Sequence, residues 1–234
     1  MLYLNDTAAA SVGIFVEHRP TRPVPRRKML SWDIPGRSGK LYRELDGFEN
    51  IQLEYELAVV PLPGIGLGDT VDLAVSWLNQ GGEMQLRDDH DPSVFYLVRY
   101  HGGSSLAPIL HDARRAKISF DADPRRWLLS GEEPVTISAG QSVTLSNPTA
   151  YAAPPLIRIF GTSGSALPGT LTVGAASVSF PDGRVLSIDC DRHSANAAIS
   201  LSNNVWPSLA PGETTVSLTG SGLSADIYPR WFVV

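Results

Sequence analysis

Strict alternation of apolar and polar residues marks the clearest strand in this chain. Residues 51–59 read I-Q-L-E-Y-E-L-A-V, and Ile, Leu, Tyr, Leu and Val occupy every second position. Successive side chains of a strand point to opposite faces, so one face of this segment is apolar. A clean alternation of this kind is typical of antiparallel sheets with one face on the core. The pattern predicts a half-buried, antiparallel strand over Ile51–Val59.

One segment has the period of an amphipathic helix. Residues 70–80 read T-V-D-L-A-V-S-W-L-N-Q, with Asp69 before them and Gly81 after them. Asp is a favoured N-cap residue, and Gly is favoured just beyond a helix C-terminus. The apolar residues at helical spacing share one face: Val71, Ala74, Val75 and Leu78. We therefore expect one helix, capped by Asp69 and ended by Gly81, with this face on the core.

The rest of the N-terminal half reads as strands and turns. The segment 83–86 and the segment 94–100 flank the turn R-D-D-H-D-P-S, which predicts a hairpin. Prolines exclude a regular helix from 17–28, which is therefore an extended or loop segment. The turn Gly36-Arg37-Ser38-Gly39 follows it, and no helix comes next, so no helix N-terminus is available there to bind an anion. We interpret this turn as a bend between extended segments.

From about Val135 the pattern is entirely β. Two tight turns are expected to close hairpins, at Ala139-Gly140 and at Asp182-Gly183. Short strands follow one another at close intervals, which suggests a β-sandwich: 156–160, 170–173, 177–180, 185–190, 215–218 and 225–228. The last segment, Ile227–Val234, is too apolar for a free tail, so we expect it to dock as a strand with Trp231 buried.

Composition supports a mainly β protein of two domains. The chain has 234 residues, 43% of them hydrophobic, with 21 Gly and 18 Pro, a mixture that suits short strands joined by tight turns. The boundary falls within Asp121–Pro134, which gives domains 1–130 and 131–234. A net charge of −5 argues against a dedicated nucleic-acid binder. Cys190 is the only cysteine, so no intrachain disulfide is possible.

Two further properties concern the cell membrane. No apolar run approaches the roughly 20 residues that span a bilayer, so we expect no membrane insertion. The first residues have no positive charge before their apolar part, so they do not have the pattern of a signal peptide.

A glycine-rich loop offers one candidate for nucleotide binding. Gly64, Gly66 and Gly68 follow a strand and precede the helix, and Asp88 and Asp89 come about 20 residues later, as in a dinucleotide fold. The spacing is G-x-G-x-G rather than G-x-G-x-x-G, and the preceding strand alternates, whereas a central parallel strand would be apolar on both faces. We interpret the segment as a loop that leads into a helix, and we expect no bound cofactor.

The acidic turn Arg87–Asp91 is a candidate metal site, because it offers three carboxylates and an imidazole. It lacks the glycine and the distal Glu of an EF-hand loop, so a solvated hairpin turn is the better interpretation. No two of the five histidines have zinc-ligand spacing: His18, His90, His101, His111 and His193. No motif favours a Ser-His-Asp set. We therefore assign no catalytic, cofactor-binding or metal-binding residue, and we predict that the protein is not an enzyme.

Two other groups of residues suggest binding. Five basic residues cluster between Arg19 and Lys28, but no aromatic residues alternate with them as in a nucleic-acid stacking platform. A solvated loop or a subunit contact fits better. In the β-rich half, Trp127, Trp206 and Trp231 could stack on sugar rings, although tryptophan in a sandwich is more often a core or domain-seam residue.

The order of motifs resembles the distal tail protein (Dit) family of long, flexible-tailed bacteriophages. The first domain supplies five motifs: IPGRSGKL, FENIQLEYEL, DTVDLAVSWLN, MQLRDDHDPSVFYLVRY and ISFDADPRRW. The second supplies four: NPTAYAAPPLIRIFGTSG, LSIDCD, NNVWPSLAPGETTVSL and ADIYPRW. Together they cover nearly the whole chain. The second domain is compact, without the long insertion in which some family members carry a sugar-binding module.

This resemblance implies a structural role in the virion. Family members form a hexameric ring at the distal end of the tail, in the tail tip or baseplate. The ring joins the tail tube to the hub and host-adhesion apparatus, and DNA passes through it during genome ejection. The implied partners are further copies of the chain, the tail tube protein, the hub protein, the receptor-binding protein and the tape-measure protein. The protein would be made in the host cytoplasm and act in the virion.

The resemblance also implies a fold. The first domain would be a β-sandwich or split barrel that forms the ring, with one α-helix and a β-hairpin, and the second a galectin-like β-sandwich. The first domain offers alternating strands with a polar face, and we expect two further elements of the subunit contact: a protruding hairpin at Met84–Tyr100 and the arginine-rich arm Arg19–Lys28.

Two other functions stay open at this point. A carbohydrate-binding module would give a saturable signal on a glycan array, and a nucleotide-dependent enzyme would show a thermal shift with NAD or FAD. Self-assembly without a ligand favours the ring protein.

Overall fold

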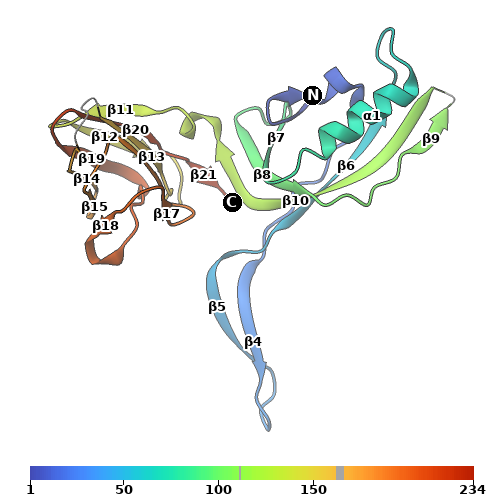
Figure 1. Cartoon of the computed structure of the whole chain (residues 1–234). Coiled ribbons are helices and arrows are strands. Elements are labelled where there is room, and N and C mark those ends of the chain that lie inside the picture. Colours follow the sequence, from blue (N-terminus) through green and yellow to red (C-terminus); the bar gives the residue numbers. More distant parts are fainter. Residues whose placement is uncertain (111, 162–165) are drawn as a thin grey trace. The chain divides into compact units, whose positions relative to one another are not determined.

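The computed structural model describes residues 1–110, 112–161 and 166–234 of the chain (Figure 1). Its contacts divide it into two compact units, Met1–Arg126 and Trp127–Val233, which we call unit 1 and unit 2. The predicted fold class is confirmed, because strands dominate both units and α1 is the only α-helix among the described residues. No helix in this part of the chain is long and apolar enough to cross a bilayer.

Unit 1 is built on one open antiparallel sheet with the strand order β2-β1-β7-β8-β10-β6-β3, to which β9 adds by pairing with β10. The elements of unit 1 are β1 (Leu2–Leu4), β2 (Thr7–Ala8), β3 (Ile14–His18), β4 (Arg27–Asp33), β5 (Lys40–Phe48), β6 (Ile51–Val59), α1 (Leu67–Leu78), β7 (Met84–Asp88), β8 (Val94–Tyr100), β9 (Ala107–Leu110) and β10 (Ala113–Leu128), with a 3-10 turn at Ala9–Val12. This sheet corresponds to the split-barrel form of the predicted ring domain.

The strand predicted over Ile51–Val59 is β6, and its burial follows the predicted alternation. Ile51, Leu53, Tyr55, Leu57 and Val59 are buried, whereas the residues between them face away from the core. β6 pairs antiparallel with β10 on one side and with β3 on the other. The core of unit 1 therefore lies on the apolar face of β6, where α1 and the strands β1, β7, β8 and β10 also contribute buried side chains.

The helix is present, but its start differs from the prediction. α1 begins at Leu67, two residues before Asp69, and Gly66 is the N-cap residue. Asp69 lies in the first turn and makes no cap hydrogen bond. The buried Thr70 takes over part of this role, because its hydroxyl donates to the Gly66 carbonyl at 2.9 Å and accepts from the Leu62 amide at 3.3 Å.

The buried face of α1 is also rotated from the predicted one. Ala74 and Leu78 are buried as expected, but Val75 is 39% exposed. Trp77 takes its place in the core, and its indole N–H donates to the Thr7 carbonyl at 3.1 Å. A large aromatic side chain buries more apolar area than valine, which favours the rotation that the structure shows.

The hairpin that protrudes is not the one we predicted. β7 and β8 do form an antiparallel pair joined by the acidic turn. They lie inside the sheet, however, between β1 and β10, and Met84, Leu86, Val94 and Val98 are buried. The expectation of a protruding hairpin at Met84–Tyr100 is therefore wrong. The exposed hairpin is formed by β4 and β5, which make a two-stranded sheet of their own (Figure 1).

Unit 2 is a sandwich of two five-stranded antiparallel sheets, as predicted. One sheet has the order β11-β20-β13-β16-β17 and the other β12-β19-β14-β15-β18. The strands are β11 (Val135–Ser138), β12 (Ser142–Asn147), β13 (Leu156–Gly161), β14 (Gly169–Val173), β15 (Ala176–Phe180), β16 (Val185–Asp189), β17 (Ser194–Ala195), β18 (Ser200–Leu201), β19 (Gly212–Gly220), β20 (Leu223–Tyr228) and β21 (Phe232–Val233), with 3-10 turns at Leu129–Gly131 and Ser202–Asn204.

Both turns expected to close hairpins in unit 2 instead connect the two sheets. β11 pairs with β20 and β12 pairs with β19, so the turn at Ala139-Gly140 crosses between layers. β15 and β16 likewise belong to different sheets. Gly183 does not have the positive φ of a two-residue hairpin turn. A side chain there would collide with Phe180 and Leu223, so close packing explains this glycine.

The expected docking of the C-terminal segment is confirmed. β21 pairs with β10, and the Leu128 amide donates to the Trp231 carbonyl at 2.8 Å. Trp231 is 6% exposed and Phe232 is 8% exposed. The Phe232 ring lies 5.5 Å from the Trp127 ring and stacks on Tyr151. The segment is therefore part of the core of unit 2.

Candidate functional site

The β4–β5 hairpin is the most unusual surface of unit 1. Every residue of its two strands is exposed except Phe48, which is half-buried. An isolated two-stranded hairpin is only marginally stable in water, so its strands gain from a partner surface. The turn between them contains Gly36 and Gly39, both with positive φ, which glycine adopts without strain. The interpretation of this turn as a bend between extended segments is confirmed.

The register of the hairpin gives it one apolar face. Trp32 pairs with Leu41 and Leu30 pairs with Arg43, and residues directly opposite each other point to the same side. Leu45 follows on the same side, two residues after Arg43. Trp32, Leu30 and Leu41 are each 44% exposed, and Leu45 is 38% exposed. We call this surface, Leu30, Trp32, Leu41 and Leu45 around Arg43, the hairpin face.

The opposite side of the hairpin is more polar. It carries Ser31, Asp33, Lys40 and Glu44 together with the exposed Met29 and Tyr42, and Lys40 pairs with Asp33 at 3.7 Å. At the base of the hairpin, the Arg27 guanidinium lies over the Phe48 ring, 5.3 Å from its centroid. The hairpin is thus amphipathic but buries neither side. Contiguous exposed apolar surface of this kind marks an interaction site.

The predicted arginine-rich arm joins β3 to the hairpin, and we call its residues 19–26 the strap. Its first arginine is not free for a partner, because Arg19 donates to both carboxylate oxygens of Asp88 at 3.0 Å and to Asp89 at 2.9 Å. These contacts raise the pKa of Arg19, chiefly through the hydrogen bond to Asp88. Arg22 and Arg26 are exposed, and neither makes an ion pair within the described residues. Two of the strap's arginines are therefore available for other contacts.

The acidic turn is neutralised by cations of the protein itself. Asp89 contacts the Met1 ammonium, which lowers the pKa of that carboxyl, and Arg19 adds to the effect. Asp91 accepts from Arg126 at 2.9 Å and from Ser93 at 3.0 Å. Within the described ranges, no group of three or more His, Cys, Asp or Glu side chains is arranged to hold a metal ion. That this turn binds no divalent metal stays a prediction, which calorimetry with calcium, zinc and manganese would check.

The glycine loop does not belong to a dinucleotide fold. The strand before it, β6, has only antiparallel neighbours, whereas a dinucleotide fold needs a parallel βαβ unit. Gly64 has a positive φ of 78° and Gly66 caps α1. The segment is a loop that leads into a helix, as we interpreted it.

The four described histidines have different local partners. His18 pairs with Glu56 at 3.0 Å, and His101 lies 3.9 Å from Asp121. The amide of His90 donates to Asp88, and the His193 ring stacks on Trp206 at 5.2 Å. His111 lies outside the described residues, as do Thr162, Ser163, Gly164 and Ser165 of the GTSG motif region.

The three tryptophans considered for sugar binding divide into two classes. Trp127 and Trp231 are buried in unit 2, as expected for core residues. Trp206 is half-buried, and the exposed His193 ring lies parallel to its ring at an interplanar angle of 9°. One face of Trp206 is therefore covered, which weakens the case for a sugar-stacking platform.

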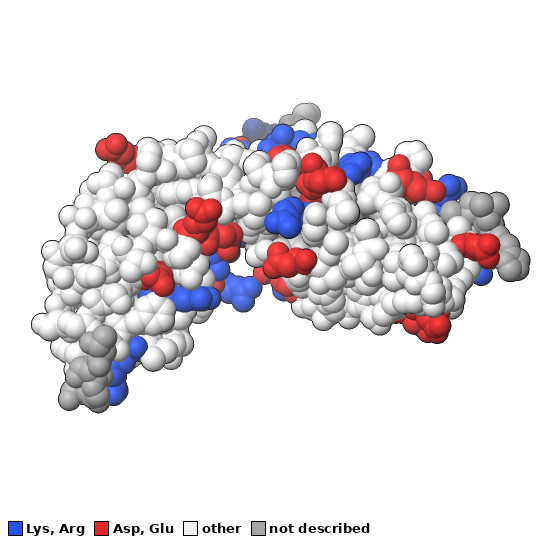
Figure 2. Space-filling model, turned by 90° about the horizontal axis from the view of Figure 1, so that it is seen from above, with Lys and Arg blue, Asp and Glu red and all other residues white. Residues whose placement is uncertain are grey.

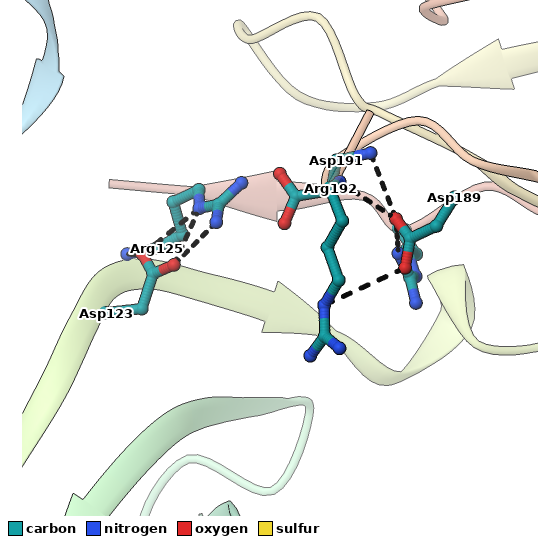
Figure 3. Close-up of polar contacts among 6 residues, drawn as sticks. Asp123, Arg125, Asp189, Asp191 and Arg192 are labelled. Atoms are coloured by element: carbon teal, nitrogen blue, oxygen red, sulfur yellow. Dashed lines mark hydrogen bonds and ion pairs between the residues drawn. The ribbon is translucent and has the colours of Figure 1, made fainter. Parts of the chain in front are cut away.

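A carboxylate-rich loop in unit 2 is structural. Asp189 accepts from the amides of Asp191 and Arg192 and lies 3.9 Å from the Arg192 side chain (Figure 3). Arg230 donates to the same carboxylate at 2.9 Å. This network fixes the chain just before β21. In unit 1, Asp123 accepts from the backbone and side chain of Arg125 (Figure 3).

Several ion pairs lie on the polar side of the unit 1 sheet. Lys117 on β10 contacts Glu54 at 2.7 Å, and Arg115 on the same strand pairs with Glu17 of β3. Gln52 and Asn50 both donate to Asp121.

In Figure 2, basic and acidic side chains are interspersed over the face shown and do not gather into one patch of a single sign. Such a face lacks the basic footprint typical of proteins that hold nucleic acid.

Comparison with known proteins identifies the fold. No protein-family model matches the sequence, and no curated protein matches it. The chain is similar to the crystal structure of the Dit protein (gp 19.1) of phage SPP1, described as a paradigm of the hub adsorption apparatus in phages that infect Gram-positive bacteria. That match has a TM-score of 0.64 and 18% sequence identity, and it covers 100% of this chain and 98% of the SPP1 protein.

The chain is also similar to a chain of the phage P2 baseplate in its activated conformation. With Ca the TM-score is 0.54 at 9% identity, and with Sr it is 0.54 at 10% identity. Each match covers 92% of this chain and 90% of the baseplate chain. The chain therefore has the β-rich fold of phage tail-tip proteins. In particular, it has a Dit-like fold, and the similarity to the SPP1 protein extends over both units.

Proposed function

We propose that this chain is a structural protein of a phage tail tip, and that its copies assemble into a hexameric ring between the tail tube and the adsorption apparatus. The observation that carries the proposal is the match to the SPP1 Dit protein over 100% of this chain and 98% of that one. The role is architectural, DNA crosses the ring during genome ejection, and no catalytic residue is assigned.

The ring is built by the first domain, residues 1–130. Closed rings need a heterologous interface, in which one surface of a subunit meets a different surface of the next. The hairpin face supports this assignment, because its four apolar side chains are 38–44% exposed in the single subunit. The strap supplies unpaired positive charge beside it.

The second domain, residues 131–234, is a galectin-like module at the periphery of the ring. Its expected partners are the receptor-binding protein and other adsorption proteins, whereas the first domain meets the tail tube, hub and tape-measure proteins. A glycan-binding role for this domain has little support, because Trp127 and Trp231 are buried and His193 covers one face of Trp206.

Native mass spectrometry across a concentration series tests the ring. The wild-type chain should shift from monomer to hexamer as its concentration rises. The double substitution Trp32→Ser and Leu41→Ser removes the centre of the hairpin face and should leave the chain monomeric over the same range. Because both side chains are exposed, the substitutions should change the free energy of unfolding by no more than about 0.5 kcal/mol each.

The matched control is Tyr42→Ser, which removes an exposed aromatic side chain from the opposite side of the same hairpin. This variant should assemble like the wild type. The proposal fails if the wild-type chain stays monomeric at high concentration, both alone and with a hub protein. The role of the hairpin face fails if both variants assemble equally well.

A further inference from the structure

A cavity in unit 1 is lined on one side by the strap. It has a volume of about 140 Å³, which is room for a small organic group. Its floor is apolar and consists of the buried side chains of Leu53, Leu86 and Val94. Tyr55 and Tyr96 also line it. We call this space the strap cavity.

The strap cavity is lined by one more arginine than aspartate, so it carries a net charge of about +1. Three arginines and two aspartates line it, and His90 is the remaining titratable side chain besides the tyrosines. Asp88 is neutralised by Arg19, and Asp91 is neutralised by Arg126. Arg22 makes no hydrogen bond or ion pair in the part of the chain that the structure describes. A single negative charge would complete the balance.

Two hydrogen-bond donors that line the strap cavity have no acceptor among the described residues. The Nε atom of Arg126 is buried and has no hydrogen-bond partner among the described residues. A buried N–H group without a hydrogen-bond partner is costly, even on a guanidinium that is ion-paired through another nitrogen, and a ligand that accepts from it is therefore favoured. The hydroxyl of Tyr96 also has no hydrogen-bond partner within the same residues. Burial raises the pKa of Tyr96, while Arg126 and Arg22, which line the same cavity, lower it.

We propose that the strap cavity binds an apolar group that carries a carboxylate. Arg22 and Arg126 hold the carboxylate, and Leu53, Leu86 and Val94 cover the apolar part. Guanidinium groups pair with carboxylates through strong, charge-assisted hydrogen bonds. The same chemistry is present in an aspartate or glutamate beside a large apolar residue of a partner protein. The inference goes beyond the proposed ring, because it concerns a site that a single subunit contains.

The test uses 3-phenylpropionate as the probe and the full chain at a concentration where it is monomeric. Titration followed by NMR or calorimetry should give saturable binding. Arg22→Gln should weaken it at least tenfold, since it removes the unpaired charge while the exposed strap leaves the fold intact. The matched control is Arg26→Gln, which removes an exposed arginine of the same strap that does not line the cavity and should leave binding unchanged.

Two further probes separate the two parts of the ligand. The uncharged 3-phenylpropionamide lacks the carboxylate, and inorganic phosphate lacks the apolar part, so each should bind at least tenfold more weakly. Tyr96→Phe should weaken binding less than Arg22→Gln.

The proposal is overturned if 3-phenylpropionate does not saturate by about 10 mM, which corresponds to a binding free energy weaker than about −3 kcal/mol. It is also overturned if Arg22→Gln binds like Arg26→Gln, or if phosphate binds as well as the probe. None of these results would affect the ring, which is measured separately by assembly.

Discussion

The contacts of Arg19 differ from those that its place in a basic cluster predicts. It belongs to a basic cluster that suggests a solvated loop or a subunit contact. In the structure it is bound by Asp88 and Asp89, which lie 69 and 70 positions away in the chain. Such a long-range pairing leaves no local pattern, so sequence reasoning could not find it. The charge available to partners is therefore carried by the later strap residues.

Cys190 gives a prediction about pH. Its side chain is 2% exposed, and burial raises the pKa of its thiol to about 12 from a reference of 9.0, with Asp189 adding to the shift. Below pH 9 both folded and unfolded chains keep the proton, so the thiol does not change the free energy of unfolding. Between pH 9 and about 12 only the unfolded chain loses it, so unfolding becomes more favourable.

The measurement is the thermal unfolding midpoint of the wild type and of Cys190→Ala between pH 7 and about pH 11, where the raised pKa acts. The wild-type midpoint should fall more steeply above pH 9 than that of the variant. Lysines and tyrosines titrate in both proteins, so the difference isolates the thiol. Equal slopes would contradict the prediction.

At the scale of elements, the sequence predicted strands well and their partners less well. β6 and β8 begin and end at the predicted residues, because alternation and turn residues are local signals. The turns at Ala139-Gly140 and Asp182-Gly183 connect different sheets, and a turn dipeptide does not distinguish this from a hairpin. Long-range packing in the sandwich decides which layer each strand joins.

The β4–β5 hairpin was missed although a local signal existed. Leu30 and Trp32 alternate with polar residues before the GRSG turn, and Leu41, Arg43 and Leu45 continue the same face after it. The prolines just upstream predict an irregular extended segment, which ends only at the start of β4. Ligand spacing and strand pattern alone were enough to weigh the metal interpretation of Arg87–Asp91 and the dinucleotide interpretation of Gly64–Gly68. The strap cavity, in contrast, is lined by the strap and by residues from β6, β7, β8 and β10, which are far apart in the sequence.

The C-terminal strand gives a prediction about stability. Trp231→Ala removes a buried aromatic side chain and should lower the free energy of unfolding by about 3–5 kcal/mol. Urea denaturation followed by circular dichroism measures it. Val205→Ala is the control, because Val205 is 53% exposed and should change stability by no more than about 0.5 kcal/mol. A Trp231→Ala protein as stable as the control would show that Trp231, just before β21, adds nothing to the core.

At the scale of the whole molecule, the strap predicts that assembly depends on salt. Arg22 and Arg26 of the strap and the nearby Lys28 of β4 are exposed, and none of them makes an ion pair within the described residues. Interactions between exposed charges are screened beyond about 8 Å at physiological ionic strength. Contacts between these residues and acidic groups of a neighbouring copy should therefore weaken as salt rises.

Sedimentation velocity at about 50 mM and about 500 mM salt measures this effect, because the Debye length falls severalfold over that range. The wild-type chain should assemble more strongly at low salt. Replacing Arg26 and Lys28 with Gln should reduce the difference between the two conditions. If assembly of the variant keeps the full salt dependence, Arg26 and Lys28 do not supply the charge contacts.

The central claim is that this chain lies at the distal end of a phage tail. The most direct measurement is immunogold labelling of purified particles with an antibody against unit 2, viewed by negative-stain electron microscopy. The account predicts label at the tail tip and nowhere else on the particle. Label on the head or along the tail tube, or particles that lack the chain altogether, would contradict it.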